Sequence, residues 1–229
     1  SVLKPFGDGI WIADGPVVVA ALGFAYPTRM AVIKLADGHL FVWSPIKLTS
    51  ELAGAVTALG PVAHVVAPNG LHHVFLAEWQ AAYPAARIYA APGLRAKRRD
   101  IAFDGDLTEI PEPAWAGQID QAVMAGNIIT SEVVFFHRDS QTVIFTDLLQ
   151  QFPARWFSGW RSVVAKLDAM TGEVPAVPRK FRVAFTDRAL ARAACQTILA
   201  WPSQRVLMAH GTPVVQGGQE ALRKAFAWL

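Results

Sequence analysis

The sequence predicts an α/β fold of the α+β kind, a four-layer αβ/βα sandwich in which two mixed β-sheets face each other and helices lie outside. Two observations support this prediction. Short β-rich runs separated by turn signals occur in both halves of the chain, and in both halves helical and strand patterns then alternate. The chain has 229 residues, of which 53% are hydrophobic and 17% charged, enough to bury a substantial core. We therefore expect a single domain over residues 1–229.

The first half begins as an antiparallel meander, because its β-rich runs are separated by Asp-Gly and Tyr-Pro turn signals. The predicted strands are Ile10–Ala13, Val17–Phe24, Met30–Leu35 and Leu40–Trp43. A helix is predicted over Leu48–Leu59, where leucine and valine recur at helical spacing, with Thr49 or Ser50 as its cap and Gly60 as its end. A βαβ-type region follows, with predicted elements His64–Ala67, His72–Ala82 and Arg87–Ala90.

The second half repeats this organisation around another hairpin. Its predicted strands are Leu107–Ile110, Ile119–Met124, Glu132–His137, Thr142–Thr146 and Val206–Ala209. Its predicted helices are Leu148–Leu167, Arg188–Leu199 and Gln219–Trp228. Asp187 is placed to cap the second of these helices, and the proline-rich stretch Glu173–Arg182 is expected to be a loop.

Composition excludes several classes of protein. The formal net charge is only +3, and the basic run Arg95–Arg99 lacks interleaved aromatic residues, so we interpret it as solvated surface and expect no nucleic-acid partner. A contact with phosphate or a polyanion is the alternative for this run. The single cysteine, Cys195, excludes an internal disulfide and cysteine-rich zinc modules, which favours a reducing, cytoplasmic location. No apolar run is long enough to span a bilayer, so no membrane span is expected.

The segment Phe152–Trp160 is dense in aromatic residues and is flanked by Arg161. We interpret it as a cover over a cleft or as a contact in a homo-oligomer, because tryptophan and arginine are favoured at protein interfaces. An interfacial membrane surface is the alternative interpretation.

Polar side chains follow three predicted strands. His72 and His73 come after the run that ends in Val-Val-Ala-Pro-Asn-Gly, Asp147 follows Val-Ile-Phe-Thr, and His210 follows Val-Leu-Met-Ala. In open α/β sheets ligands gather at the carboxyl ends of strands. Three imidazoles and a carboxylate form a ligand set that zinc and related ions accept. The alternatives are structural, with the histidines packed or capping a helix and Asp147 capping the helix after its strand.

Several segments resemble a known superfamily. The segments VAPNGLHH, TVIFTDLL and MAHGTPV, together with Gly126-Asn127, resemble the metallo-β-lactamase superfamily. The segments AYPTRMAVIKLADG, VVAPNGLHHVFLAEW and EVVFFHRDSQTVIFTDLL are similar to a divergent branch known as domain of unknown function 4336. This resemblance covers nearly the whole chain and implies the metallo-β-lactamase fold.

The resemblance also implies a degenerate metal site. The superfamily motif His-x-His-x-Asp-His, with a further His, an Asp and a final His, binds two metals. Here Pro68 and Gly70 occupy the positions of the first two histidines, and Asn127 lies near the position of the third-motif His, which implies loss of the first metal. The positions that bind the second metal hold His72, His73, Asp147 and His210.

Two functional hypotheses follow. In the first, the protein is a mononuclear metal-dependent hydrolase that binds one Zn²⁺, Fe²⁺ or Ni²⁺ and acts on an unknown small molecule, with Asp147 as ligand or general base. The candidate substrate-binding residues are Asn69, Asn127 and Arg29. In the second, the metal has been lost altogether, and the cleft of a non-catalytic member binds a small molecule or a protein partner.

Overall fold

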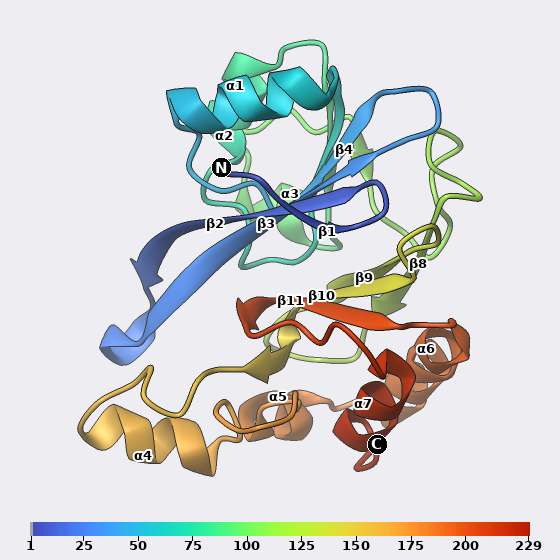
Figure 1. Cartoon of the computed structure of the whole chain (residues 1–229). Coiled ribbons are helices and arrows are strands. Elements are labelled where there is room, and N and C mark those ends of the chain that lie inside the picture. The colour runs from blue at the N-terminus through green and yellow to red at the C-terminus, as the bar shows by residue number, and fades with distance from the viewer. Residues whose placement is uncertain (1) are drawn as a thin grey trace.

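The computed structural model describes residues 2–229 and places two β-sheets face to face, with helices on both outer sides (Figure 1). The first sheet has seven strands, in the spatial order β1 (Lys4–Gly7), β2 (Ile10–Val19), β3 (Ala25–Lys34), β4 (Leu40–Trp43), β5 (Val62–Ala67), β6 (Arg87–Ala90) and β7 (Gly105–Asp106). Strands β1 to β4 pair antiparallel and β4 to β7 parallel. The second sheet has the order β11 (Arg205–Gly211), β10 (Thr142–Gln151), β9 (Glu132–His137) and β8 (Ile119–Met124). Only its β10–β11 pair is parallel.

The helices form the two outer layers. In Figure 1, α1 (Ser50–Leu59) and α2 (Leu76–Ala82) lie above the first sheet and α3 (Leu94–Lys97) lies behind its strands; all three contribute to one apolar cluster with this sheet. The remaining four lie below the second sheet: α4 (Trp160–Leu167), α5 (Arg179–Ala184), α6 (Arg188–Ala200) and α7 (Gly218–Ala225). In the described part of the chain, no helix is both long and apolar enough to cross a bilayer. The two mixed sheets with helices outside confirm the predicted fold class.

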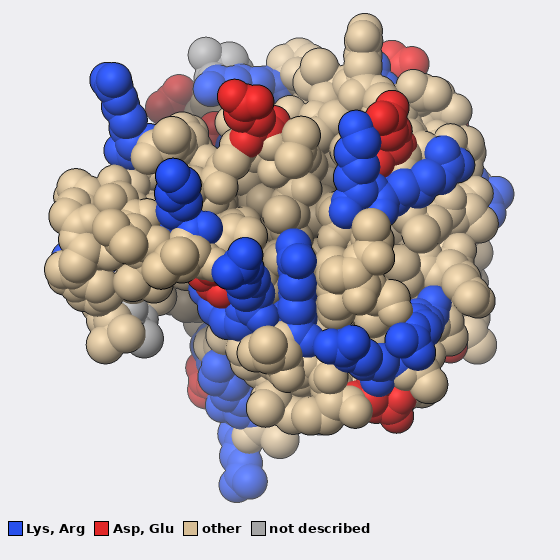
Figure 2. Space-filling view, turned by 90° about the horizontal axis from the view of Figure 1, so that it is seen from below, with Lys and Arg blue, Asp and Glu red and all other residues tan. Residues whose placement is uncertain are grey.

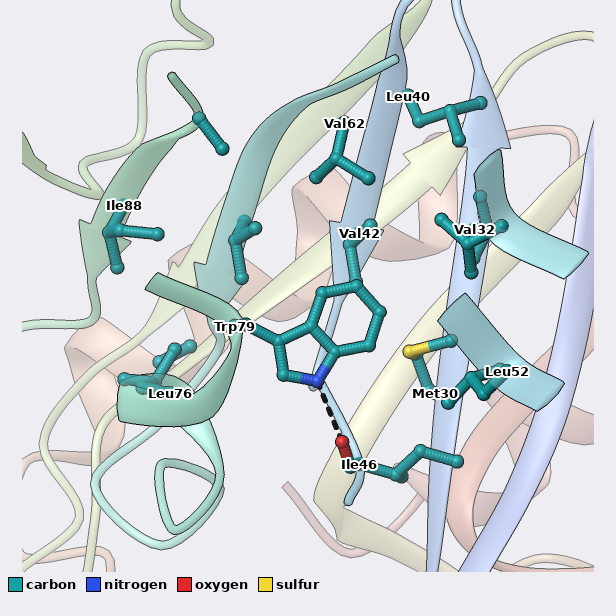
Figure 3. Packing of buried hydrophobic residues seen from close by; sticks show 14 of the residues in the cluster. Met30, Val32, Leu40, Val42, Ile46, Leu52, Val62, Leu76, Trp79 and Ile88 are labelled. Atoms are coloured by element: carbon teal, nitrogen blue, oxygen red, sulfur yellow. Dashed lines mark hydrogen bonds between the residues drawn. The ribbon is translucent and has the colours of Figure 1, made fainter. Parts of the chain in front are cut away.

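The core of the first sheet follows the period of two expected of a strand whose two faces are both covered. Along β3, Met30 and Val32 pack against the helical layer, whereas Ala31 and Ile33 pack against the second sheet. The helical side is centred on Trp79 of α2, whose indole Nε1 donates a hydrogen bond of 2.7 Å to the carbonyl of Ile46 (Figure 3). This bond satisfies the one polar atom of a fully buried side chain.

The second sheet alternates in the same way. Along β9, Val133 and Phe135 face the first sheet, and Val134 and Phe136 face the cluster that includes residues of α6 and α7. A continuous apolar layer therefore lies between the two sheets, and a further one lies under each helical layer.

Helix caps occur where the sequence predicts them. Thr49 accepts a hydrogen bond from the backbone N–H of Leu52 at 3.2 Å and begins α1. The Asp187 carboxylate accepts one from the N–H of Leu190 at 3.1 Å and begins α6. Each cap satisfies one of the backbone donors that a helix leaves free in its first turn.

Several predicted elements were wrong in whole or in part. The predicted helix Leu148–Leu167 is extended as part of β10 up to Gln151, because its leucines are buried in the second sheet's core, and helix forms only from Trp160. The predicted helix His72–Ala82 begins at Leu76, after a turn. Leu107–Ile110 is a turn closed by Thr108, and the predicted loop Glu173–Arg182 contains the start of α5.

The predicted strands Ile10–Ala13 and Val17–Phe24 are wrong as separate elements, because β2 runs through both of them and the predicted Asp-Gly turn is only an irregularity in its pairing with β3. The predicted Tyr-Pro turn lies within β3. Strand β2 ends at Val19, and the chain turns through the short 3₁₀ segment Ala21–Gly23 into β3. Strands β2 and β3 thus form a long arm that reaches past the sheet toward α4 (Figure 1). Of the aromatic segment after β10, Phe152 and Phe157 are buried in a small cluster with Phe24, whereas Trp156 and Trp160 are exposed.

Candidate metal centre

Three of the predicted ligands converge at one point between the two sheets. His72, Asp147 and His210 each offer a ligand atom, and these atoms all lie within 4.8 Å of one another. The Nε2 atoms of the two histidines are 3.3 Å apart. The Asp147 Oδ1 is 2.9 Å from Nε2 of His210, and its Oδ2 is 3.3 Å from Nε2 of His72.

Three separate elements supply these side chains. His72 lies in the turn between β5 and α2, Asp147 lies within β10, and His210 lies near the end of β11. Strands β10 and β11 pair regularly up to Phe145 and Met208, and the next pair is Gln150 with His210. Strand β10 therefore carries extra residues in a bulge opposite β11. Bulges re-aim side chains, and this one brings Asp147 beside His210.

The buried carboxylate of Glu132 stabilises this bulge. Glu132 opens β9 and is 0% exposed. Its oxygens accept hydrogen bonds from the backbone N–H groups of Thr146 at 2.6 Å, Asp147 at 2.8 Å and Leu148 at 3.1 Å. The carboxylate satisfies donors in the irregular part of the strand, which would otherwise be costly to bury.

Each of the three converging side chains also makes a hydrogen bond to a residue outside the group. Nδ1 of His210 is 3.0 Å from the carbonyl oxygen of Pro27, and Nδ1 of His72 is 2.9 Å from the hydroxyl of Ser44. The amide of Asn69 donates to Oδ2 of Asp147 at 2.6 Å. Hydrogen bonds of this kind orient metal ligands in known metal sites.

The three groups also shift one another's ionisation. Burial works against an ionised Asp147, but the imidazoles of His72 and His210 hold its pKa well below the usual value. Burial likewise opposes protonation of His72, but the charge of Asp147 outweighs it and raises the pKa of His72. For His210 burial prevails, so its pKa is lowered despite the same carboxylate. Burial and the nearby Asp147 raise the pKa of Glu132 to about 7.

The donor set fits a divalent ion. A carbonyl can only accept, so the contact with Pro27 places a proton on Nδ1 of His210 and leaves the lone pair of Nε2 directed at Asp147. The Ser44 hydroxyl can accept a proton from Nδ1 of His72 in the same way, and the lone pairs of both imidazoles and of the carboxylate would then be directed at one point, where a cation can bind. Two histidines, one carboxylate and an open position form a ligand set known from catalytic zinc sites.

His73 lies apart from this group. Its Nδ1 is 3.0 Å from Nη1 of Arg98, which also donates to the His73 carbonyl at 2.6 Å. Burial and the charges of Lys97 and Arg98 lower the pKa of His73 to about 4. The ring lines the cleft described below, but its Nδ1 is occupied by the guanidinium.

The candidate substrate-binding residues do not line that cleft. Asn69 lies behind Asp147, where its side-chain oxygen also accepts from the N–H groups of Leu71 and His72. Asn127 is buried, donates to the carbonyl of Phe181 and accepts from the N–H of Ile129. The guanidinium of Arg29 is bound to the Asp14 carboxylate and to carbonyls of β11, so it anchors the strand that carries His210.

A cleft of about 790 Å³ opens beside the three converging side chains. His72, Asp147 and His210 form part of its wall. The β2–β3 arm, the turn before α2 and helices α4 and α5 supply most of the remaining wall. The phenyl ring of Phe152 stacks at 6.0 Å on the imidazole of His210, and the Tyr26 ring meets its edge at 5.0 Å.

Sequence reasoning missed two polar residues of the site. The sequence held one sign that Glu132 has a role: it is a carboxylate at the start of the apolar run Glu-Val-Val-Phe-Phe. A carboxylate that is buried in such a strand needs hydrogen-bond partners. For Ser44 the sequence held no signal of a role in the site, apart from its position directly after β4. Its role depends on the unusual backbone angle φ of 50° at this residue.

Comparisons with known proteins agree with this architecture. A family described as a domain of unknown function (DUF4336) matches residues 7–156. The metallo-β-lactamase FIM-1 from Pseudomonas aeruginosa, solved in a mono-zinc form, is 11% identical, with a TM-score of 0.62 over 97% of this chain and 93% of that chain. A metallo-β-lactamase from Erythrobacter litoralis, with β-mercaptoethanol in its active site, is 11% identical, with a TM-score of 0.66 over 99% and 96%.

A third similar structure comes from a different kind of protein. The metal-soaked flavodiiron core of Flv1 from Synechocystis sp. PCC6803 is 13% identical, with a TM-score of 0.67 over 99% of this chain and 60% of that chain. No curated protein sequence matches the chain significantly. At these identities the structural similarity shows the metallo-β-lactamase fold alone.

Proposed function

We propose that this chain, which belongs to the DUF4336 family and has the metallo-β-lactamase fold, is a hydrolase that uses one metal ion held by His72, Asp147 and His210. The observation that carries the proposal is the convergence of these three ligand atoms from three elements onto the wall of one cleft. Zinc is the first choice for two imidazoles and a carboxylate, with iron and nickel as alternatives.

The chain's own residues divide the work as follows. Bound at this position, the ion would supply a Lewis acid and lower the pKa of a coordinated water to about 7. Asp147, kept ionised by the two imidazoles, would hold the ion through its carboxylate. Ser44 and the Pro27 carbonyl fix the ring orientations, and Asn69 fixes the carboxylate. The aromatic rings around His210 keep water from its far side.

A single ion suits this chain better than a pair. Pro68 and Gly70 have no side-chain ligand, and both polar atoms of the Asn127 amide are used inside the fold. The FIM-1 structure is described as a mono-zinc form, so a protein of this fold can hold one zinc.

The competing hypothesis is a metal-free cluster. The direct contacts of Asp147 with both histidines, at 2.9 and 3.3 Å, favour it, since a proton on His72 would join the three groups without a metal. Such a protein would bind a ligand in the cleft without hydrolysing it.

Hydrolysis by the zinc-loaded protein separates the two hypotheses. An activated ester, a thioester, an amide and a phosphodiester should be tested with wild type, Asp147→Asn and the control Asp120→Asn, whose carboxylate pairs with Arg138 on the surface. We expect at least one substrate to be turned over, with kcat/KM lowered at least about 100-fold in Asp147→Asn and unchanged in the control. Equal turnover by Asp147→Asn and wild type, or no turnover of any substrate, would contradict the proposed function.

A further inference from the structure

We propose that the substrate is an acyl compound, such as an ester, a thioester or an amide, whose uncharged apolar tail, several carbons long, lies in the cleft beside the candidate metal centre. This inference rests on the proposed function, because it assigns a substrate class to the same site. It is carried by three features of the cleft: its apolar wall, the position of its polar groups and the exposed apolar residues at its mouth.

The wall of the cleft is mostly hydrocarbon and comes from several separate segments. The apolar lining residues include Val18 and Leu22 of the arm, Leu71 and Val74 of the turn before α2, and Val164 and Leu167 of α4. A volume of about 790 Å³ lies within the range of small-molecule sites, which runs from roughly 300 to 1,000 Å³. A reactive carbonyl group next to Asp147 would leave most of this volume to the rest of the molecule.

The side chains described in the cleft wall include no unpaired lysine or arginine for an anionic substrate. Among the described residues of this wall, Lys180 is the only lysine or arginine. Its ammonium lies 3.7 Å from the Asp168 carboxylate, which also lines the cleft, and donates to the Tyr26 hydroxyl at 3.1 Å. Arg98, behind the wall, is paired with Asp100 and His73. The pairing favours an uncharged group over a carboxylate or a phosphate in the part of the ligand that lies away from the candidate metal centre.

The mouth of the cleft continues the apolar wall to the surface. Leu22 is 76% exposed, Leu167 62% and Val74 61%. These three residues line the cleft and belong to three different segments. Figure 2 shows the molecule from below, with Lys and Arg gathered toward the centre and right of the view. The lobe at its left, where Figure 1 places α4 and the end of the β2–β3 arm, is largely uncharged. The mouth therefore offers exposed apolar surface from three segments to an apolar tail.

Binding of uncharged, non-hydrolysable probes tests this inference without a metal. We would titrate 1-butanol, 1-hexanol, 1-octanol and 1-decanol into wild type and two variants of α4. Val164→Asp places a charge in the wall, whereas Val163→Asp places one on an exposed neighbour that does not line the cleft. The Kd of wild type and Val163→Asp should fall by up to about fourfold per added methylene. Val164→Asp should weaken decanol binding at least about tenfold and leave butanol binding nearly unchanged.

Two results would overturn the inference. One is a Kd that does not depend on chain length, or that is the same in both variants. The other is tighter binding of octanoate than of octanol, which would require a free cation in the cleft. Circular dichroism of both variants checks that each is folded.

Ester hydrolysis distinguishes failure of this inference from failure of the proposed function. For the zinc-loaded protein, kcat/KM should rise from p-nitrophenyl acetate to butyrate to octanoate, and the rise should be lost in Val164→Asp. Equal kcat/KM for all three esters would contradict the substrate class while supporting a hydrolase. Chain-length-dependent alcohol binding without any hydrolysis would contradict the hydrolase and support the apolar ligand.

Discussion

At the scale of single residues, Ser44 shows how the backbone serves the candidate site. Its φ of 50° lies in the left-handed region, which costs a residue with a Cβ about 1–2 kcal/mol. The backbone N–H still bonds to the carbonyl of Val66 at 3.1 Å, and the side chain is directed at Nδ1 of His72. Strain of this kind at a cleft wall suggests that the hydroxyl group is needed there.

Replacing Ser44 by glycine should separate metal affinity from stability. Glycine adopts the left-handed conformation without strain but lacks the hydroxyl, so we expect unfolding free energy within about 1 kcal/mol of wild type. Metal affinity should fall about 10- to 100-fold, the usual effect of losing a group that orients a ligand. Competition with a chelator measures the affinity, and urea unfolding measures the stability.

Gln141 offers a matched control for this substitution. It has a φ of 48° in the turn between β9 and β10 and does not line the cleft. Gln141→Gly should leave metal affinity unchanged. Equal affinities of Ser44→Gly and wild type would exclude an orienting role for the hydroxyl.

The convergence of the site residues was predictable only in part. Strand patterns and the resemblance pointed to His72, Asp147 and His210, and the structure brings these three together. His73 belongs to the same motif but lies beside Arg98, because two adjacent residues in a turn point in different directions. The contact between His73 and Arg98 joins residues 25 positions apart in the sequence, so no local sequence pattern could predict it.

At the scale of elements, the irregular β10–β11 pair determines where Asp147 and His210 meet. After the bulge, pairing resumes at Gln150 with His210 and Gln151 with Gly211. Gly211 has a φ of 121°, and a Cβ at this position would overlap the backbone of Gln151. The close approach of the two strands beyond the bulge therefore requires glycine.

Two glycine-to-alanine substitutions should have opposite effects on stability. Gly211→Ala should lower the unfolding free energy by at least about 2 kcal/mol, because strands β10 and β11 must separate. Gly54→Ala lies on α1 with open space around it and should raise the unfolding free energy by up to about 1 kcal/mol. Urea unfolding measures both. A Gly211→Ala protein as stable as wild type would show that the strands do not need this approach.

Elements with strong local signals were predictable, and those set by tertiary contacts were not. Helix α1 with its Thr49 cap, and strands β6, β8 and β9, follow from periodicity and turn residues. The stretch after Asp147 has helical composition, but burial of Leu148 and Leu149 and the hydrogen bonds to Glu132 keep it extended. Tertiary packing overrides local propensity there.

At the scale of the whole molecule, the two sheets share one apolar layer. Phe41 of the first sheet packs on Phe135 of the second with ring centroids 5.5 Å apart, and Trp115 packs on Phe41 at 5.1 Å. If one sheet unfolded, the apolar face of the other sheet would be exposed to water. We therefore propose that residues 1–229 form one cooperative domain.

Unfolding in urea should accordingly be a single transition. Far-UV circular dichroism, which follows both sheets, and tryptophan fluorescence should give the same midpoint. Phe135→Ala should lower the unfolding free energy by about 3–5 kcal/mol and shift both signals together. Two separated transitions, or a shift of only one signal, would contradict a single cooperative domain.

The metal content of the protein tests the central claim most directly. Wild type, His210→Ala and the surface control His39→Ala should be incubated with zinc, iron or nickel, passed through a desalting column and measured by elemental analysis; His39 is a partly exposed residue that pairs with Asp37. The account predicts about one ion per chain in wild type and in His39→Ala, and retention lowered at least about tenfold in His210→Ala. A wild type that retains none of these ions, or a His210→Ala protein that retains as much as wild type, would contradict it.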